Sequence, residues 1–451
     1  MMWLYNVLWL LALPAVCCLL GVRRLTLGKY RRNLGPRFGL GLKNRSLSKG
    51  RRVIWLHALS VGEVLSALPL VHCLQQEFPS YQLVFSTTSE AGHRLARRRL
   101  ASSNCSFFYL PLDLWWMMRR AVKAVGAELF LLVETDLWPN LLYYLDREGT
   151  PIVLVNGRLS DRSFSRYLRV RKLYTSFFQR ITMLCLQSQE DSRRMQVLGI
   201  EPARIRVTGN LKFDQPLSRS PAQERIDLLV TLGLKPRPFT WVAGSTHAGE
   251  EEIILRIYSC LRQRFADFFL IMAPRNPERF GLVARLAEQK GWQTVRRSQL
   301  PRGAGLEEPD ILVVDTIGEL VQFYALGTFA FIGGSMVRSG GHNPLEAAQR
   351  GLPVVFGPHM ENFKEIAAIL VESGGGFQVH GEAGLRDRVA DWLSAPHACQ
   401  EQGKRAREAV VLHQGAVGRT MEVIRELLAA RHYERLRGFP RPAGLGSGDS
   451  A

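Results

Sequence analysis

The chain has 451 residues, which is too long for one ordinary hydrophobic core, so we expect two domains of about 150–200 residues each. Apolar residues make up 46% of the chain and charged residues 22%, which excludes a wholly disordered protein. The formal net charge of +19 indicates an anionic partner, which can be a membrane surface, an acidic substrate or nucleic acid. Seven cysteines without CxxC spacing exclude a disulfide framework and a zinc site, and they favour a reduced, cytoplasmic body.

The N-terminal segment, residues 1–22, is almost wholly apolar and just reaches the length of about 20 residues that spans a hydrocarbon core. Basic residues follow this segment at Arg23 and Arg24 and none precede it, which favours an uncleaved anchor with the body on the cytoplasmic side. Pro14 leaves open a helix that lies in the membrane surface, and a helix packed into the body is the plain alternative. Residues 23–52 hold eleven Lys or Arg and no acid, which predicts contact with anionic lipids or a solvated basic linker.

Beyond the basic segment, short apolar runs alternate with amphipathic stretches, a pattern typical of parallel strands joined by helices. Residues 215–223, rich in Pro and Ser, are expected to link two α/β halves at residues 53–214 and 224–415. Residues 416–437 are expected to form a C-terminal helix and residues 438–451 a disordered tail. The expected strands are 53–56, 83–86, 129–133, 152–155, 183–186, 206–208, 239–243, 268–272, 311–314, 330–332 and 353–356.

Polar motifs follow several of these strands, at the edge where open α/β sheets bind their ligands. Ser60, Gly62 and Glu63 follow the first strand, and Glu63 opens a helix. A carboxylate there can take a proton from an attacking hydroxyl if burial raises its pKa. The same spacing fits a capping box, in which Ser60 and Glu63 only satisfy the start of the helix. The motif therefore leaves a catalytic and a structural interpretation open.

Three further polar residues of the first half are candidates for substrate contacts. Glu134 follows an apolar strand, where it can orient sugar hydroxyls or belong to a structural hydrogen-bond network. Arg158 can bind an acidic group on a substrate, or it can pair with Asp161. Lys212, near the predicted linker, can contact a phosphate or the acceptor, or it is a solvated residue.

The second half begins with small residues that follow its first strand. Ser245 and Thr246 stand at a helix start, where free backbone N–H groups attract an anion, although Thr246 or His247 can also be a plain cap. Arg275 lies between two prolines, which suits a rigid contact to a phosphate or carboxylate.

The Gly-rich loop of the second half is the most informative motif. Glycines such as Gly334, which precedes Ser335, let a ligand approach the backbone closely. Asn343 and Pro344 predict an N-cap and a first helical residue, and such a helix start can bind a phosphate. Glu346 can accept hydrogen bonds from a ribose, or it completes a capping box with Asn343. The loop fits neither a Walker A motif nor a GxGxxG fingerprint.

The N-terminal anchor and eight motifs together resemble the Kdo (3-deoxy-D-manno-octulosonic acid) transferase family of lipopolysaccharide biosynthesis. The motifs, in chain order, are HALSVGE, YLPLD, ETDLWPN, NGRLS, GNLKFD, GSTHAGEE, APRNPERF and GGSMVRSGGHNPLEAA. With the anchor, the resemblance runs from the first residue to about residue 430. It implies an α/β GT-B fold, in which two Rossmann-like domains face a cleft. It also implies a single anchor in the bacterial inner membrane, with the catalytic body on the cytoplasmic face.

The resemblance further implies a reaction and the residues that serve it. Kdo passes from CMP-Kdo to lipid IVA with inversion, without a metal ion or another cofactor and without a nucleic-acid partner. Glu63 is the implied general base and Glu134 a functionally sensitive acid. The residues implied to bind CMP are Ser245, Thr246, Arg275, Gly334, Ser335, Asn343 and Glu346. A GT-B enzyme that uses a UDP-sugar on a lipid, or a membrane-tethered nucleic-acid binder, is the alternative.

Overall fold

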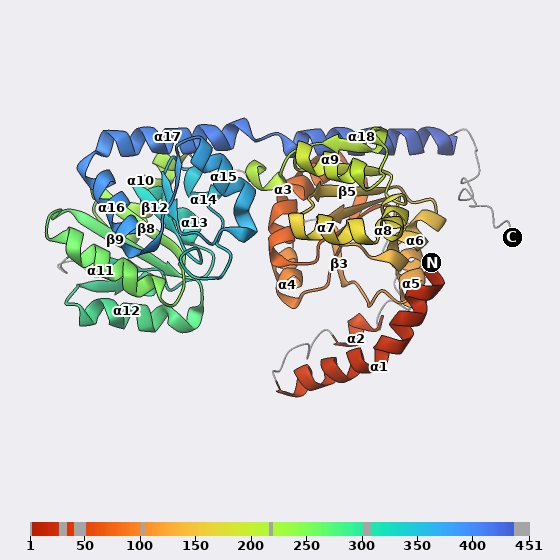
Figure 1. The fold of residues 1–451 in the computed structure, drawn as a ribbon, viewed down its shortest axis with the longest axis horizontal. Helices are drawn as coiled ribbons and strands as arrows, with labels where there is room; N and C mark the ends of the chain where they lie inside the picture. Colours follow the sequence, from red (N-terminus) through yellow and green to blue (C-terminus); the bar gives the residue numbers. More distant parts are fainter. Residues whose placement is uncertain are drawn as a thin grey trace. The chain divides into compact units, whose positions relative to one another are not determined.

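The computed structural model describes residues 2–26, 34–39, 51–100, 104–215, 220–300 and 308–436. The chain divides into two compact units (Figure 1): the first comprises Met1–Gln215 and Gln414–Ala451, and the second comprises Pro216–His413. Most of the predicted basic segment, residues 216–219 of the predicted linker and the predicted tail lie outside the described residues.

The first unit contains a sheet of seven parallel strands in the order β3-β2-β1-β4-β5-β6-β7. Its strands are β1 (Arg52–His57), β2 (Tyr81–Thr87), β3 (Cys105–Tyr109), β4 (Leu129–Val133), β5 (Ile152–Gly157), β6 (Met183–Leu186) and β7 (Ile205–Val207). The strand order reverses between β1 and β4. In open parallel sheets, ligands bind beyond the carboxyl ends of the strands at such a switch point.

Helices cover both faces of this sheet, because successive strand residues point to opposite sides. Val53 and Trp55 of β1 pack against α5, α6, α8 and α9, whereas Ile54 and Leu56 pack against α3, α4 and α18. The helices are α1 (Met2–Thr26), α2 (Leu34–Arg37), α3 (Val61–Glu77), α4 (Glu90–Arg99), α5 (Trp115–Val125), α6 (Pro139–Arg147), α7 (Asp161–Arg169), α8 (Arg171–Phe178), α9 (Gln189–Val197), the 3-10 turns η1 (Pro202–Arg204) and η2 (Leu211–Asp214), and α18 (Ala416–Leu436).

The second unit repeats the architecture with strands in the order β10-β11-β9-β8-β12-β13-β14, so its switch point lies between β8 and β12. The α/β fold with two parallel sheets that the sequence predicts is therefore confirmed. The strands are β8 (Phe239–Thr246), β9 (Phe268–Pro274), β10 (Thr294–Arg296), β11 (Ile311–Val313), β12 (Phe329–Ile332), β13 (Val354–Phe356) and β14 (Gly376–Gln378). The helices are α10 (Pro221–Leu232), α11 (Glu250–Arg262), α12 (Phe280–Gln289), α13 (Leu320–Phe323), α14 (Leu345–Ala348), α15 (Lys364–Glu372), α16 (Gly381–Ser394) and α17 (Pro396–Leu412).

The last helix, α18, belongs to the first unit although it follows the second in sequence (Figure 1). Its apolar face joins the core beside α3, with Met421, Ile424 and Leu428 buried. The Asp214 carboxylate caps its start by accepting hydrogen bonds from the backbone N–H groups of Gly415 and Val417, at 2.8 and 2.6 Å. The sequence predicts a helix here but gives no sign of its partner.

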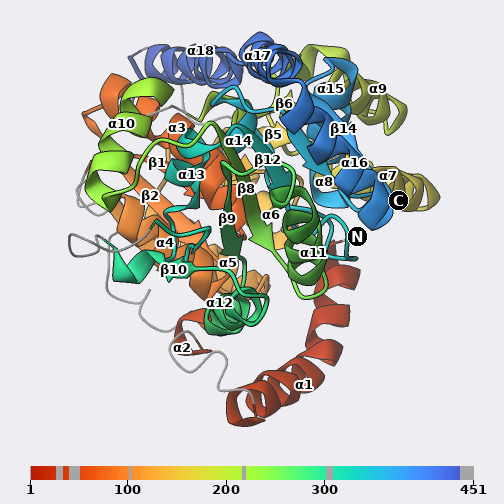
Figure 2. The ribbon, with the colours of Figure 1, turned by 90° about the vertical axis from the view of Figure 1, so that its left-hand side faces the viewer.

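The N-terminal helix α1 is long and apolar enough to cross a membrane, and none of Met2–Leu19 is fully buried. It bends along its length (Figures 1 and 2), and Pro14 lies inside it. Its first half nevertheless packs on the first unit, because Trp9 and Leu13 lie against the core beneath α5 and α6.

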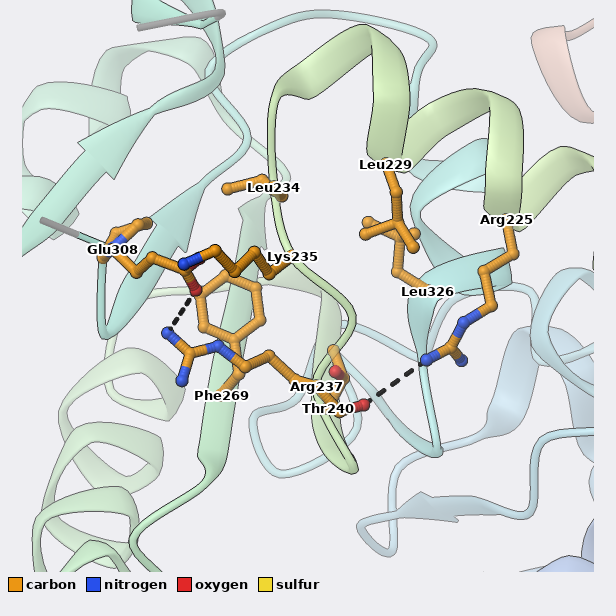
Figure 3. A pocket seen from close by; sticks show the side chains of 10 residues that line it. Arg225, Leu229, Leu234, Lys235, Arg237, Thr240, Phe269, Glu308 and Leu326 are labelled. Carbon is orange, nitrogen blue, oxygen red and sulfur yellow. Dashed lines mark hydrogen bonds and ion pairs between the residues drawn. The ribbon is translucent and has the colours of Figure 1, made fainter. Parts of the chain in front are cut away.

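A small cavity in the second unit lies between α10 and the start of β8 (Figure 3). Its volume is about 10 Å³, which is room for about one water molecule. Glu308 pairs there with Arg237 at 2.8 Å and with Lys235 at 3.1 Å. These contacts lie at the amino ends of the strands, so we assign this cavity a structural role.

Candidate active site

The Glu63 carboxylate lies just beyond the carboxyl end of β1, in the first turn of α3, and is only 6% exposed. Its Oε2 atom accepts a hydrogen bond from the Leu59 N–H at 2.6 Å, and its Oε1 atom accepts one from the Ser60 hydroxyl at 2.9 Å. Ser60 Oγ also accepts from the Glu63 N–H at 3.3 Å. The capping contacts that the sequence predicts are thus present, although Leu59 replaces Ser60 as the backbone donor. They fix the carboxylate in one orientation.

The pKa of Glu63 is raised from 4.5 to about 7, chiefly by burial and also by the negative charges of Glu134 and Asp136. The hydrogen bonds from Leu59 and Ser60 act in the opposite direction. A carboxylate with a pKa near neutral both accepts and releases a proton readily at working pH. The site therefore has the chemistry of a general base.

Gly62 stands beside this carboxylate, exposed in the first turn of α3. A methyl group at this position would meet only Ser60 Oγ, at an ordinary contact distance of 3.8 Å. No close backbone approach within the described unit requires glycine here.

Glu134 and Lys212 form an ion pair at this edge of the sheet, with 3.6 Å between Lys212 Nζ and Glu134 Oε1. Both side chains are mostly buried, so Lys212 is not the solvated residue of the alternative interpretation. Burial and the neighbouring Glu134 raise the pKa of Asp136. The end of β4 thus concentrates negative charge near Glu63, partly balanced by Lys212.

Arg158 is held through its backbone, which leaves its guanidinium available. Its N–H donates to Thr135 Oγ1 at 3.0 Å, and the Thr135 hydroxyl donates to the Arg158 carbonyl at 2.5 Å. The alternative partner, Asp161, pairs instead with Arg194 at 2.5 Å. Within the described part of the chain, the Arg158 side chain has no ion pair, so a substrate carboxylate can take that place.

Backbone strain marks the same edges of both sheets. Among the described non-glycine residues, those with positive φ are Glu134 at 58°, Asn156 at 57° and Ser245 at 56°. Each lies at the carboxyl end of a strand: Glu134 directly follows β4, and Asn156 and Ser245 are the last but one residues of β5 and β8. Such conformations cost about 1–3 kcal/mol and persist mainly at functional sites. Asn156, which sequence reasoning missed, also accepts a hydrogen bond from the Leu211 N–H at 2.9 Å.

In the second unit, Glu250 of α11 binds the Gly-rich loop that follows β12. Its carboxylate accepts hydrogen bonds from the backbone N–H groups of Gly334, Ser335 and Met336 at 2.8, 3.0 and 2.9 Å. It also accepts from the His247 N–H at 2.9 Å. Sequence reasoning missed Glu250, which is 1% exposed. The loop backbone that the sequence predicts a ligand can approach is therefore occupied here by a carboxylate of the protein itself.

Two details of the predicted phosphate site need correction. Ser335 is completely buried, and its hydroxyl accepts from the Gly357 N–H at 2.8 Å, so it joins the ends of β12 and β13 instead of facing a ligand. The predicted helix start at Pro344 opens only the single turn α14, because Ala348 already ends it. A single turn has little dipole to offer an anion. Asn343 Oδ1 still caps this turn by accepting from the Leu345 N–H at 3.1 Å.

Other predicted residues do come together beyond β8 and β9. The Arg275 N–H donates to the Thr246 carbonyl at 2.9 Å, and the Arg275 side chain is exposed. Thr246 itself is buried, with its hydroxyl 3.4 Å from Glu251 Oε1. Burial raises the pKa of Glu346, whereas Asn343 and Arg275 lower it.

Two histidines that sequence reasoning did not select complete this group. Nε2 of His247 lies 2.9 Å from Nε2 of His342, and their rings are nearly parallel. The pKa of His342 is lowered to about 4, chiefly by burial and also by the positive charge of Arg275 and by His247. His342 is therefore neutral near pH 7. Only its position beside Asn343 in the GGHNP motif could have indicated it.

Comparison with known proteins identifies the family. Residues 32–215 match the family model described as 3-deoxy-D-manno-octulosonic-acid transferase. A 3-deoxy-D-manno-octulosonic acid transferase of Haemophilus influenzae is 34% identical over 94% of this chain and 98% of its own length. One from Chlamydophila psittaci is 31% identical over 78% of this chain and 80% of its own.

Among solved structures, UDP-GlcNAc 2-epimerase from Neisseria meningitidis is 12% identical. The match covers 84% of this chain and 100% of the epimerase, with a TM-score of 0.55. That likeness concerns the fold alone, and it agrees with the predicted GT-B architecture. On the strength of the near full-length sequence relationship, the chain belongs to the Kdo transferase family, the glycosyltransferases of lipopolysaccharide biosynthesis.

Proposed function

We propose that the protein transfers Kdo from CMP-Kdo to lipid IVA, with inversion and without a metal ion. Family membership supports the transferred sugar, and the motif resemblance supports the donor and the acceptor. The observation that carries the mechanism is the buried Glu63 carboxylate at the switch point of the first sheet, whose pKa burial raises to about 7.

In this mechanism, Glu63 takes the proton of an acceptor hydroxyl while the hydroxyl oxygen attacks the anomeric carbon of Kdo. One new C–O bond forms, and the bond from the anomeric carbon to the phosphate oxygen of CMP breaks. CMP leaves with the electron pair, and a single displacement inverts the anomeric centre. Arg158 is suited to the carboxylate of an acidic sugar, because its guanidinium has no ion pair within the described unit.

The second unit supplies the donor contacts in this proposal. Exposed Arg275 stabilises the charge that develops on the departing phosphate. Asn343 and Glu346 are within reach of each other at 3.3 Å and suit ribose hydroxyls. Ser245 offers its strained backbone at the end of β8. Gly334, Ser335 and Thr246 shape the site instead of binding the nucleotide, since their polar groups are engaged or buried.

In this proposal, the membrane anchor determines where in the cell the reaction takes place. Helix α1 is apolar enough to anchor the protein at the inner membrane, and the basic residues that follow it favour the cytoplasmic face. A lipid acceptor would then stay close to the first unit.

The test is transfer from CMP-Kdo, generated in situ, to lipid IVA by detergent-purified protein in the presence of a chelator. We expect Glu63→Gln to lower kcat by about 10²–10⁴-fold, because the base is lost. Glu77→Gln is the matched control, since Glu77 lies at the other end of α3 and only pairs with exposed Arg425.

Three results would contradict parts of this proposal. Full activity of Glu63→Gln would contradict the role of Glu63 as the general base. If product forms only after a divalent metal is added, the reaction is not metal-independent. Displacement of the donor by UDP instead of CMP would point to a different nucleotide sugar.

A further inference from the structure

A cavity of about 380 Å³ opens between the start of α1 and the helices α5 and α6 of the first unit. This volume is typical of small-molecule pockets. Val7 and Leu10 of α1 form one wall, and Trp115 and Tyr143 form the opposite one. None of the residues that line it carries a charge. A nucleotide or a sugar phosphate would find no counter-ion there, whereas an apolar chain would find a matching surface.

The cavity is built by specific polar contacts that fix one face of α1 against the body. The Tyr5 hydroxyl donates to Asp113 Oδ2 at 2.8 Å, and Trp9 Nε1 donates to the Tyr5 oxygen at 2.7 Å. Asn140 Nδ2 donates to Asn6 Oδ1 at 2.8 Å. Asp113 is only 2% exposed and also accepts from the Asn140 N–H at 3.0 Å. Loss of these contacts would leave buried polar groups unpaired, so α1 is held in this rotation.

Asn140, which lines the cavity, has one buried polar atom without a partner among the described residues. Asn140 is 1% exposed, and its Nδ2 group donates to both Asn6 Oδ1 and the Asp113 carbonyl, which settles the orientation of the amide. Among the described residues, no group donates to its Oδ1 atom. Buried acceptors are normally satisfied. Because this oxygen is itself buried, a ligand in the cavity does not reach it, and the surface that the cavity offers is mainly apolar and aromatic.

The pocket also lies at the same edge of the sheet as the candidate active site. Helix α6, which carries Asn140 and Tyr143, begins at Pro139, directly after the loop that holds Glu134 and Asp136. Those two carboxylates are close enough to Glu63 to raise its pKa. A lipid whose sugar reaches Glu63 can thus extend an acyl chain along the same edge of the sheet towards α1.

We infer that this pocket holds an acyl chain of the acceptor lipid, packed against the apolar and aromatic side chains that line it. The inference rests on the proposed function, which makes the acceptor a lipid. Helix α1 then does more than attach the protein to a membrane, because it forms one wall of the acceptor site.

The test compares two tryptophan substitutions on α1. Val7→Trp fills the pocket, whereas Leu8→Trp adds the same bulk one residue along, on a side chain that is 57% exposed and does not line the pocket. Each methylene kept out of the pocket costs about fourfold in affinity. We therefore expect Val7→Trp to raise KM for the acylated acceptor about tenfold or more, with kcat on the acyl-free disaccharide unchanged. Leu8→Trp should change neither. Equal effects of the two substitutions, or an equal loss on both acceptors, would overturn the inference.

A second readout does not depend on turnover. An acceptor analogue with a photoreactive acyl chain should label peptides that contain Trp115 or Tyr143, and Val7→Trp should abolish this labelling. Labelling by a photoreactive phospholipid but not by the acceptor analogue would overturn the assignment to the acceptor. If wild-type protein is labelled by the acceptor analogue but transfers nothing, the pocket stands and the proposed reaction fails.

Discussion

Two opposing effects act on the ionised form of Glu63. As a helix cap it is stabilised by the Leu59 N–H and the Ser60 hydroxyl, yet burial disfavours its ionised form. The same burial that makes the group a useful base therefore reduces the stability of the folded protein at neutral pH. A residue that only capped α3 would not need to be buried beside two further carboxylates.

The loss of stability caused by the burial of Glu63 depends on pH. Because the pKa of Glu63 rises from 4.5 to about 7 on folding, the folded state binds the proton more tightly than the unfolded state. The free energy of unfolding therefore decreases through this group as pH rises from 4.5 to 7, by on the order of 3 kcal/mol in total. Glu63→Gln lacks the effect. We expect unfolding by urea to show the variant gaining stability relative to wild type between pH 5 and pH 8. A constant difference across that range would contradict the buried, ionisable state of Glu63.

The sequence could predict residues whose chemistry shows in local spacing, and not those defined by distant partners. Ser60 and Glu63 stand three residues apart in one turn, so their contact was foreseeable. Glu250 binds Ser335, 85 positions later in the chain, and no local pattern indicates that pair. The local sequence around Glu250 shows only a carboxylate three residues after His247, and this spacing predicts no more than a helix cap.

At the scale of elements, Glu250 ties the start of α11 to the loop after β12. Its carboxylate accepts four backbone N–H groups, and an amide in its place would turn a donor towards some of them. We expect Glu250→Gln to reduce the free energy of unfolding by about 1–3 kcal/mol and to weaken CMP binding, because the loop loses its shape. Calorimetry of CMP binding and thermal unfolding measure both effects. Glu252→Gln is the control, since Glu252 accepts from one backbone N–H, that of Gly249 at 2.8 Å, and otherwise forms a longer ion pair with Arg279 at 3.7 Å. Equal effects of the two substitutions would contradict the proposal that Glu250 maintains the shape of the loop after β12.

The C-terminal helix is a second element whose role depends on tertiary packing. Ile424 of α18 is completely buried in the core beside α3, so Ile424→Ala should destabilise the first unit by about 2–5 kcal/mol. Leu412→Ala is the matched control, because Leu412 is 81% exposed at the end of α17. Thermal unfolding should separate the two variants clearly. A small, equal loss in both would mean that α18 is not part of this core.

Sequence patterns located most strands but missed β3, β10 and β14. All three lie at an edge of their sheet. An edge strand is covered less completely, and these three are only partly buried, so they lack the continuous apolar run that marks a central strand. The central strands β1, β4, β8 and β9 show that run plainly, which is why the switch points and the motifs beyond them were predictable.

At the scale of the whole molecule, the two units differ in how the chain builds them. Pro216–His413 forms the second unit from one continuous segment, whereas the first unit needs Met1–Gln215 together with Gln414–Ala451. Folding of the first unit thus waits for the last residues of the chain, since α18 supplies part of its core. The second unit has its own sheet and its own core and carries all of the proposed CMP contacts.

Fragments of the chain should show this asymmetry. We expect residues 216–413 alone to unfold cooperatively and to bind CMP, because no strand or core residue of the second unit comes from outside that segment. Residues 1–215 alone should aggregate, since the apolar surface that Met421, Ile424 and Leu428 cover would be exposed to water. Co-expression with residues 414–451 should restore a soluble first unit. Circular dichroism and calorimetry with CMP decide the outcome: a stable 1–215 fragment would show that α18 is dispensable. A folded 216–413 fragment that binds no CMP, beside a full-length chain that does, would mean that the first unit takes part in donor binding.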